Sequence, residues 1–393
     1  MSKPVKVLHI VNRMNKGGIQ SFLMNYYRNM DRSAIQFDFV VQANEGSFYD
    51  NEITELGGKL YNLPQMSVTD VRAFSRELST LLRESSEYKI IHSHLNWLNV
   101  IPLKIAKKHN VPVRISHSHG SYPSRNLFKA MQRLVFQKVV DFYATDLWAC
   151  SELAGRWLYG EDFLDNPKSK VIHNAIDVDK FKFNPEIRKR LRVAHNLDPE
   201  TKVLINVGRL SDGKNHSFLL DVFKEYQLLN PNSVLLIAGD GPLRSQIEEK
   251  AQTLKIADKT IFLGMIDNVN EYLSASDIMV FPSESEGLSL VLIEAQTNGL
   301  EILVSDEGIS KETDVTGRLK FLKLSENAST WAQNICDLSN IDRQNSVDVV
   351  REAGYDIKQA ARALQHHYLD LIKSNYPTFY TDRRTKRGLS RFV

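Results

Sequence analysis

Short apolar runs rich in valine and isoleucine alternate with amphipathic segments along this chain, and the alternation occurs twice. The first apolar run, 6–11, precedes a glycine pair and then apolar residues at helical spacing over 19–30. Further apolar runs in the first half lie at 36–41, 89–95 and 113–119. Strands that alternate with helices imply a parallel sheet with crossover helices, so the expected fold class is α/β.

The alternation restarts after a charged connection. The stretch 173–201 contains two prolines and no strand pattern, which is typical of a link between domains. Beyond it, apolar runs lie at 202–210, 233–241, 260–266, 277–283 and 301–306. We therefore expect two α/β domains, 1–180 and 181–356, then a helix over about 357–376 and a basic tail, 377–393.

Composition narrows the class of protein. A chain of 393 residues with 42% apolar and 25% charged residues is long enough for about two domains. A net charge of +3 argues against a nucleic-acid partner. Cys150 and Cys336 are far apart and form no disulfide framework, which favours a reducing cytoplasm. No run approaches the ~20 apolar residues of a membrane-spanning helix.

Two segments are candidates for contact with a membrane surface. Basic and apolar residues interleave over 126–143, as in helices that lie on anionic membranes. The tail 381–393 holds five basic residues against Asp382 alone. An ordinary surface helix and a solvated tail would look the same, so both readings stay open. The expected localisation is cytoplasmic, with peripheral attachment to the inner face of the cell membrane as an addition.

Cations and glycines follow several of the expected strands. Gly17 and Gly18 open the helix at 19–30, which suits close approach of backbone N–H groups to a phosphate, although glycine turns before helices are common. Arg209 follows the apolar strand at 202–207, and Lys214 lies five residues later. Ligands of parallel sheets bind at such strand ends. An arginine and a lysine there can offset the charge of a diphosphate.

The stretch 281–298 places two acidic residues around an apolar helix. If the helix begins near Leu288, the N–H groups of Gly287, Leu288 and Ser289 form an anion site at its positive end. Glu286 precedes this start, and Glu294 lies six residues beyond it, a rise of roughly 9 Å. That rise is comparable to the distance between the two sugars of a nucleotide-sugar, whose hydroxyls carboxylates can bind.

Two His-x-His pairs raise the question of a metal. His92 and His94, and likewise His117 and His119, would each point to one face of a strand and could bind zinc. No cysteine lies near them in sequence, and histidines at strand ends in a polar cleft are the simpler reading. We therefore expect no metal.

Two other patterns point away from their usual chemistry. Asp177 and Asp179 form an Asp-x-Asp, the pattern that metal-dependent glycosyltransferases of another fold use to hold the diphosphate of their nucleotide-sugar. Here the pattern falls in the connection between the two expected domains, so we interpret it as structural. The glycines of 17–18 and of 239 and 241 do not have the Gly-x-Gly-x-x-Gly spacing of a nicotinamide site.

Several motifs together resemble glycosyltransferase family 4. They are GGIQ (17–20), GRLSDGKN (208–215), AGDGPL (238–243), FLGMIDN (262–268) and EGLSLVLIE (286–294). The resemblance implies a retaining nucleotide-sugar transferase of the GT-B architecture, with two Rossmann-like domains facing each other across a cleft and the helix 357–376 returning to the first domain. The segment 305–324 resembles the branch that builds bacterial capsular and exopolysaccharides.

The resemblance also implies roles for the donor side. Arg209 and Lys214 would bind the donor diphosphate, together with the helix amides of Gly287, Leu288 and Ser289, while Gly17 and Gly18 would face the phosphates from the opposing domain. Backbone groups around Met265 and Ile266 would receive the nucleobase. Glu286 would bind the transferred sugar and Glu294 the ribose. The catalytic histidine of the family aligns with His119, and His117 is the nearby alternative. Ser289 departs from the proline that relatives often have.

The implied reaction needs no cofactor or metal. The donor would be a nucleotide-sugar, with a UDP-sugar as the expectation, and the acceptor a glycan or a polyprenyl-pyrophosphate-linked oligosaccharide. The departing phosphate would itself help to deprotonate the acceptor. Two alternatives are an inactive nucleotide-sugar-binding regulatory subunit and a sugar-nucleotide epimerase, which would release a sugar without an acceptor.

Overall fold

The computed structural model describes residues 3–15, 17–42, 46–66, 71–120, 136–284, 289–307, 309–338, 343 and 346–375. The chain divides into two compact units, Met1–Ala175 with Ile357–Val393, and Ile176–Asp356. The division lies slightly before the expected boundary after residue 180, and the helix after Ile357 belongs to the first unit. Among the described residues, no helix is both long and apolar enough to cross a membrane.

A parallel sheet forms the centre of the first unit. In sheet order its strands are β3 (Leu60–Asn62), β2 (Ile35–Val41), β1 (Val5–Ile10), β4 (Tyr88–Ser93), β5 (Val113–Ser118), β6 (Asp146–Ala149) and β7 (Ser169–Val171). Every neighbouring pair is parallel. The central strands are buried on both faces, which is why they read as continuous apolar runs and not as alternating ones.

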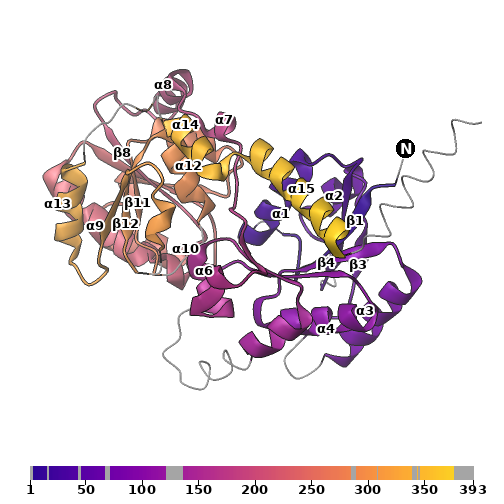
Figure 1. The fold of residues 1–393 in the computed structure, drawn as a ribbon. Coiled ribbons are helices and arrows are strands. Elements are labelled where there is room, and N and C mark those ends of the chain that lie inside the picture. The colour runs from indigo at the N-terminus through magenta and orange to yellow at the C-terminus, as the bar shows by residue number, and fades with distance from the viewer. Residues whose placement is uncertain are drawn as a thin grey trace, which may run out of the picture. The chain divides into compact units, whose positions relative to one another are not determined.

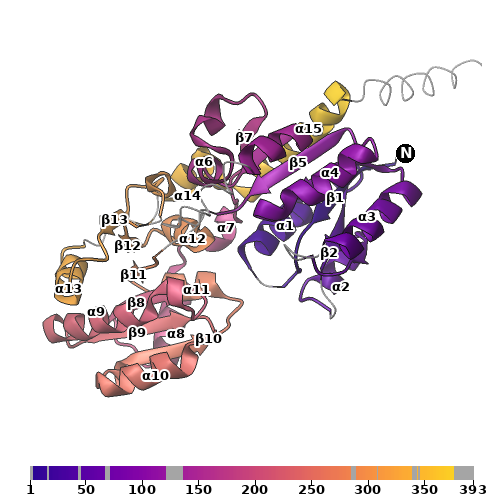
Figure 2. The same cartoon turned by 90° about the horizontal axis from the view of Figure 1, so that it is seen from below.

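Helices cover both faces of this sheet. They are α1 (Gly18–Asn29), α2 (Asp50–Glu55), α3 (Arg72–Glu84), α4 (Val100–Lys108), α6 (Glu152–Tyr159) and α15 (Ile357–Asn375), with 3₁₀ turns at Asn96–Asn99 and Glu161–Asp165 and helical residues at 136–143. Helix α1 packs beside α15 on one face, and α3 packs beside α4 on the other (Figure 1). Figure 2 shows α4 and α15 on opposite sides of β5.

Helix α1 illustrates how the pattern produces the packing. Phe22, Leu23, Tyr26 and Tyr27 recur at helical spacing and are all buried in the core of the first unit. Residues of α15, including the fully buried Tyr368, join the same core. The C-terminal helix is therefore part of the structure that supports one face of this sheet.

The second unit contains its own parallel sheet. In sheet order the strands are β10 (Thr260–Gly264), β9 (Ser233–Ala238), β8 (Lys202–Val207), β11 (Ile278–Phe281), β12 (Glu301–Ser305) and β13 (Leu319–Leu322). All described neighbours are again parallel. The expected fold class, α/β with two Rossmann-like domains, is confirmed.

The helices of the second unit also lie on both faces. They are α7 (Val178–Phe181), α8 (Pro185–Ala194), α9 (His216–Leu229), α10 (Arg244–Thr253), α11 (Val269–Ala275), α12 (Leu290–Asn298), α13 (Ala328–Cys336) and α14 (Ser346–Val350). Shorter turns lie at Asp212–Lys214, Ala257–Lys259, Lys311–Thr313 and Arg351–Tyr355. Helices α9, α10 and α13 share one core. Helices α7 and α14 pack against α12 (Figure 1), and α11 also packs against it.

The charged connection is part of the second unit and contains α7 and α8. Arg188 and Arg192 of α8 both form ion pairs with Asp277, which lies just before β11. Asp177 caps α7 by accepting a hydrogen bond from the Lys180 amide. Asp179 pairs with Arg351, as the structural interpretation of this Asp-x-Asp requires.

The loops after β8 and β9 approach so closely that one position requires glycine. Gly239 has φ +141°, and a Cβ there would lie 1.9 Å from the carbonyl oxygen of Gly208. The Gly208 amide donates to the Ala238 carbonyl oxygen at 2.9 Å, which holds the two strand ends side by side. This contact fixes the start of the loop that carries Arg209.

Substitution of Gly239 tests this close approach. We expect Gly239→Ala to lower the free energy of unfolding by about 2–3 kcal/mol, because the backbone must move to relieve the overlap. Gly213→Ala is the control, since no atom lies within 4 Å of its added Cβ, and it should change stability by less than about 0.5 kcal/mol. Urea denaturation measures both, and equal stability of the two variants would contradict the close approach of the loops.

Candidate active site

Each sheet has one place where the order of strands reverses. In the first unit it lies between β1 and β4, and in the second between β8 and β11. Open parallel sheets bind ligands outside the carboxyl ends of their strands at such a point. The residues expected to act lie at or near these two edges, so we describe each unit separately.

Arg209 and Lys214 both lie beyond the carboxyl end of β8. Arg209 is exposed, two residues after the strand ends. The Lys214 side chain passes over Gly208, and its Nζ lies 5.2 Å from the centre of the Phe281 ring at the end of β11. The two cations thus lie at the reversal point between β8 and β11, where they can bind an anion.

Met265 and Ile266 follow β10 at the same edge of the sheet. Gly264 has φ +66° and turns the chain there. The Met265 side chain is 62% exposed, and Ile266 is partly buried. An exposed apolar side chain in such a turn is suited to contact with a flat ring. The assignment of this loop to the nucleobase stays a prediction.

Helix α12 begins two residues later than expected. Ser289 has extended backbone angles, φ −77° and ψ 110°, and is the residue that precedes the helix, so its first turn starts at Leu290. Ser289 accepts a hydrogen bond from the Leu292 amide through its carbonyl oxygen. Glu286, Gly287 and Leu288 lie outside the described residues, and their roles stay predictions.

Glu294 is in the second turn of α12 and has an unusual environment. With the helix start at Leu290 it lies four residues in, a rise of about 6 Å instead of the expected 9 Å. Its side chain is partly exposed, yet burial among its neighbours raises the pKa to about 7, and Lys180 lowers it by a smaller amount. No described residue forms a hydrogen bond or ion pair with this carboxylate, which leaves it available to a ligand.

Gly17 and Gly18 lie at the N-terminus of α1, as expected. Gly17 precedes the helix, and its carbonyl oxygen accepts the first helical hydrogen bond, from Ser21. Both glycines are exposed, and nothing lies within 4 Å of a Cβ placed on Gly18. The backbone amides of this turn can therefore be approached from outside.

The two histidine pairs of the first unit lie on one face of the sheet, as the alternation along a strand predicts. His117 is fully buried in β5, whereas His119 follows the end of the strand and is partly exposed. His119 is thus the member of its pair at the edge where ligands bind. His94 bonds to His119 and His92 bonds to His117 across neighbouring strands.

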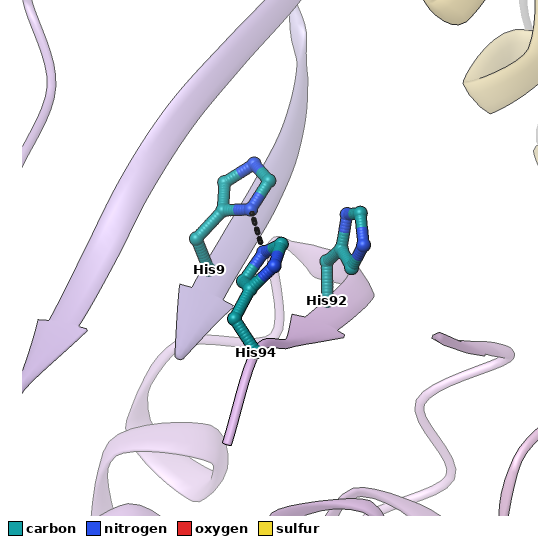
Figure 3. Close-up of side chains that lie close together, drawn as sticks. All are labelled: His9, His92 and His94. Carbon is teal, nitrogen blue, oxygen red and sulfur yellow. Dashed lines mark hydrogen bonds between the residues drawn. The ribbon is translucent and has the colours of Figure 1, made fainter. Parts of the chain in front are cut away.

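His9 joins these four histidines and is not among the site residues that the sequence predicts. Figure 3 shows the His9 and His94 rings turned toward each other and joined by a hydrogen bond, with His92 beside them. Its apolar run, 6–11, gives no hint of this role. Only the position of β1 next to β4 brings it into the group.

The histidine nitrogens are close enough together to raise the question of a metal again. In two groups, His9 with His92 and His94, and His94 with His117 and His119, three nitrogens lie within 4.8 Å of one another. Two separations, 2.7 and 3.0 Å, are hydrogen-bond distances. No described carboxylate bonds to these rings, although metal-binding histidines usually donate to such a group.

Comparisons with known proteins agree with this arrangement. Residues 16–180 match the family model "Glycosyltransferase Family 4", and residues 187–356 match "Glycosyl transferases group 1". The chain is 32% identical over 372 residues to the protein named "Putative glycosyltransferase EpsF" of Bacillus subtilis, covering 93% of this chain and 97% of EpsF.

More distant relatives carry more specific names. The capsular polysaccharide biosynthesis glycosyltransferase CapH of Staphylococcus aureus is 26% identical over 381 residues, which cover 93% of this chain and 99% of CapH. An Escherichia coli UDP-Gal:α-D-GlcNAc-diphosphoundecaprenol α-1,3-galactosyltransferase is 29% identical over 242 residues, 57% of this chain and 59% of that enzyme.

Solved structures show the same fold. The crystal structure of Anabaena HepE in complex with UDP and glucose superposes with a TM-score of 0.71 at 17% identity, over 94% of this chain and 100% of HepE. The two parallel-sheet units, the order of motifs along them and the near full-length match to EpsF lead to one assignment. The chain belongs to glycosyltransferase family 4 and has the GT-B fold.

Proposed function

We infer that this protein is a retaining, metal-independent glycosyltransferase that moves a sugar from a UDP-sugar to a lipid-linked oligosaccharide or glycan during cell-surface polysaccharide synthesis. The observation that best supports a donor site is that Arg209 and Lys214 both lie at the strand reversal of the second unit. Two cations there match the charge of a diphosphate. Glu294, whose carboxylate has no described partner, lies on the helix after β11 and can accept ribose hydroxyls.

The names of relatives support the choice of substrates. HepE was crystallised with UDP and glucose, which favours a uridine nucleotide here. The Escherichia coli relative is named for transfer of galactose from UDP-Gal to a diphosphoundecaprenol-linked sugar, which favours a lipid-linked acceptor. CapH is named for capsular polysaccharide synthesis, and the resemblance of 305–324 points the same way.

The charges suggest how transfer proceeds. The bond between the anomeric carbon and the diphosphate oxygen breaks, and the acceptor oxygen bonds to that carbon on the same face. The acceptor proton goes to the departing phosphate. Negative charge grows on the diphosphate during this step, so Arg209 and Lys214 stabilise the transition state more than the bound donor. His119 and Glu286 would contact the transferred sugar.

A lipid-linked acceptor would require access to a membrane surface. The candidate segment 126–143 is described only from residue 136 onward, where 136–143 are helical, and the basic tail lies outside the described residues. Peripheral contact through these two segments is part of the proposal. Vesicle flotation with and without anionic lipid tests it.

Product analysis tests the proposed reaction. Purified protein is incubated with UDP-sugars and a polyprenyl-pyrophosphate-linked sugar, and the product is examined by NMR for its anomeric configuration. Transfer with an α linkage from an α-linked UDP-sugar supports retention, and a β linkage overturns it. A free epimerised sugar would indicate the epimerase, and nucleotide binding without any product would indicate a regulatory subunit.

Removal of one of the two cationic side chains that are proposed to bind the diphosphate should weaken this reaction selectively. We expect Lys214→Met to lower kcat/KM by about 10- to 100-fold, the usual effect of losing one hydrogen bond to a charged group. Lys224→Met is the control, because Lys224 lies in the third turn of α9, well beyond the strand ends. Steady-state release of UDP measures both variants, and equal loss in the two would remove Lys214 from the site.

A further inference from the structure

Three histidines of the first unit form one continuous chain of hydrogen bonds that ends at the ligand edge. Nδ1 of His9 lies 3.0 Å from Nε2 of His94, and Nδ1 of His94 lies 2.7 Å from Nε2 of His119. His9 and His94 are buried, and His119 is partly exposed beyond β5. We call these residues the His119 chain.

A second chain lies beside the first and provides a comparison within the same core. The Tyr368 hydroxyl lies 2.7 Å from Nδ1 of His92, and Nε2 of His92 lies 3.0 Å from Nδ1 of His117. Nε2 of His117 is buried and has no hydrogen-bond partner in the described part of the chain. This His117 chain therefore ends inside the core, whereas the His119 chain ends at the ligand edge.

The surroundings of the His119 chain keep its rings uncharged. Phe37 and Phe39 pack against His9, and Phe22 packs against His119. Burial lowers the pKa of His9 and of His119 to about 3 and also lowers that of His94. A neutral imidazole has one N–H donor and one acceptor nitrogen, so each ring can donate one hydrogen bond through one nitrogen and accept one through the other.

This restriction leaves only two arrangements of protons along the chain. In the outward arrangement His9 donates to His94, His94 donates to His119, and the proton of His119 is on Nδ1. In the inward arrangement every bond is reversed, and the proton of His9 is on Nε2. The tautomer of His119 is therefore determined together with those of His9 and His94.

The free ends distinguish the two arrangements. Nε2 of His9 and Nδ1 of His119 are both buried without a partner among the described residues. The inward arrangement leaves an N–H of His9 permanently against phenylalanine rings, which are weak acceptors. The outward arrangement places the N–H on Nδ1 of His119, an atom that is itself buried but belongs to a partly exposed side chain at the ligand edge, where a ligand hydroxyl that enters can accept it. Each arrangement leaves one N–H without an acceptor, and the outward arrangement places it on the partly exposed residue at the strand end and not among the phenylalanine rings, which favours the outward arrangement with and without a ligand.

We propose that His9 and His94 are positioning residues that hold His119 as the Nδ1–H tautomer, so that His119 meets the substrate as a hydrogen-bond donor and not as a base. Nε2 of His119 is occupied by His94, which leaves Nδ1 as its only ring nitrogen for a ligand. This inference rests on the proposed function for the contact between His119 and the sugar. It agrees with a mechanism in which the acceptor proton goes to the phosphate.

The tautomer can be measured without any substrate. Protein labelled with ¹⁵N-histidine is examined by long-range ¹H–¹⁵N correlation, and His119 is identified by its loss in His119→Gln. We expect a protonated Nδ1 and an unprotonated Nε2 on His119, and loss of this single tautomer in His94→Leu. A protonated Nε2 on His119 in the wild-type protein overturns the proposal, whether or not the protein transfers sugar.

Kinetics then tests whether the tautomer matters for transfer. With UDP-glucose, UDP-galactose and UDP-N-acetylglucosamine as donors, His94→Leu should lower kcat on the order of 10²-fold and leave KM close to that of wild type. His94→Asn keeps a donor near the position of Nδ1 and should lose less than about tenfold. Tyr368→Phe removes one buried hydrogen bond from the His117 chain and should also lose less than about tenfold.

Two results would contradict the account of the chain. Equal loss of kcat in His94→Leu and Tyr368→Phe would mean that any damage to the histidine core has the same effect. A stoichiometric metal in the purified protein, whose removal by EDTA shifts the imidazole resonances, would mean that these nitrogens bind an ion instead of one another. If the tautomer is as expected but no donor is used, the proposed function fails while the arrangement of the chain stands.

Discussion

Acidification from pH 7 to 5.5 should destabilise this protein by about 2.5 kcal/mol through His9 and His119, and further in the same direction through three more buried histidines. Burial lowers the pKa of His9 and His119 to about 3, and it lowers the pKa values of His92, His94 and His117 well below their usual range. An unfolded histidine titrates near 6.5, so below this pH the unfolded chain binds protons that the folded chain does not.

The sign and size of the change in stability follow from this difference in proton binding. The histidines contribute their full stability above pH 6.5, and the contribution falls as the pH drops toward 3. A histidine whose folded pKa is near 3 loses about 1.3 kcal/mol between pH 7 and 5.5, so His9 and His119 together lose about 2.5 kcal/mol. Domains of ordinary stability have about 5–15 kcal/mol, so a marked loss of stability of the first unit between pH 7 and 5 is the expected result.

Urea denaturation at a series of pH values measures this effect as a slope. His9→Phe keeps an aromatic ring between Phe37 and Phe39 and should reduce proton uptake below pH 6 by about one of the five protons. Phe22→Leu weakens packing against His117 and His119 without removing a titrating group. It should therefore lower the free energy of unfolding by a similar amount at every pH and leave its slope against pH unchanged. A wild-type slope near zero between pH 6 and 5 would show that the histidines are not buried as neutral rings.

Replacement of Glu294 by glutamine should stabilise the free protein and weaken nucleotide binding at the same time. The Glu294 pKa is raised to about 7 from an ordinary value of 4.5, so the folded state binds this proton more tightly than the unfolded state. Stability is therefore lost as the pH rises from 4.5 through 7, by up to about 3 kcal/mol. Glu294→Gln removes that loss, so the variant should be more stable at pH 8 and nearly equal to wild type at pH 5.

The loss of stability that the Glu294 carboxylate causes is explained if its negative charge is needed to bind a ligand. We expect Glu294→Gln and Glu294→Ala to bind UDP about 10- to 100-fold more weakly, because a carboxylate accepts ribose hydroxyls more strongly than an amide does. Glu248→Gln breaks an exposed ion pair with Arg244 on α10 and should change neither property by more than about 1 kcal/mol. Unaltered UDP affinity in both Glu294 variants would show that this residue is not part of the donor site.

The fold is largely predictable because long apolar runs in a parallel sheet are easily recognised. The runs at 6–11 and 202–210 correspond to β1 and β8, the central strands of their sheets. Strands β3 and β7 have only three residues each, too few for a recognisable pattern. The short helices of the connection are charged, and α8 packs through ion pairs with Asp277, so no apolar stripe marks them in the sequence.

The candidate site is predictable only in part, for a physical reason. Arg209 and Lys214 follow the end of β8 by two and seven residues, so sequence order alone places them at the ligand edge. His9 is a single histidine inside an apolar strand, and it enters the site through a contact between strands more than 80 residues apart in sequence. Lys180 similarly lowers the pKa of Glu294 from α7, a helix distant in sequence that packs against α12. Contacts of this kind depend on strand order and not on local pattern.

The binding of UDP tests the central claim most directly. Isothermal titration calorimetry, supported by thermal shifts, compares UDP with GDP and ADP and with their common sugar conjugates, with and without EDTA. A ligand that binds only the folded protein raises its stability by about 2.7 kcal/mol at 100 times its Kd, so even modest affinity is measurable. The account predicts that UDP and a UDP-sugar bind and that EDTA changes nothing. If no nucleotide binds, the strand reversal marked by Arg209 and Lys214 is not a donor site, and the proposed transferase, the regulatory subunit and the epimerase are all contradicted.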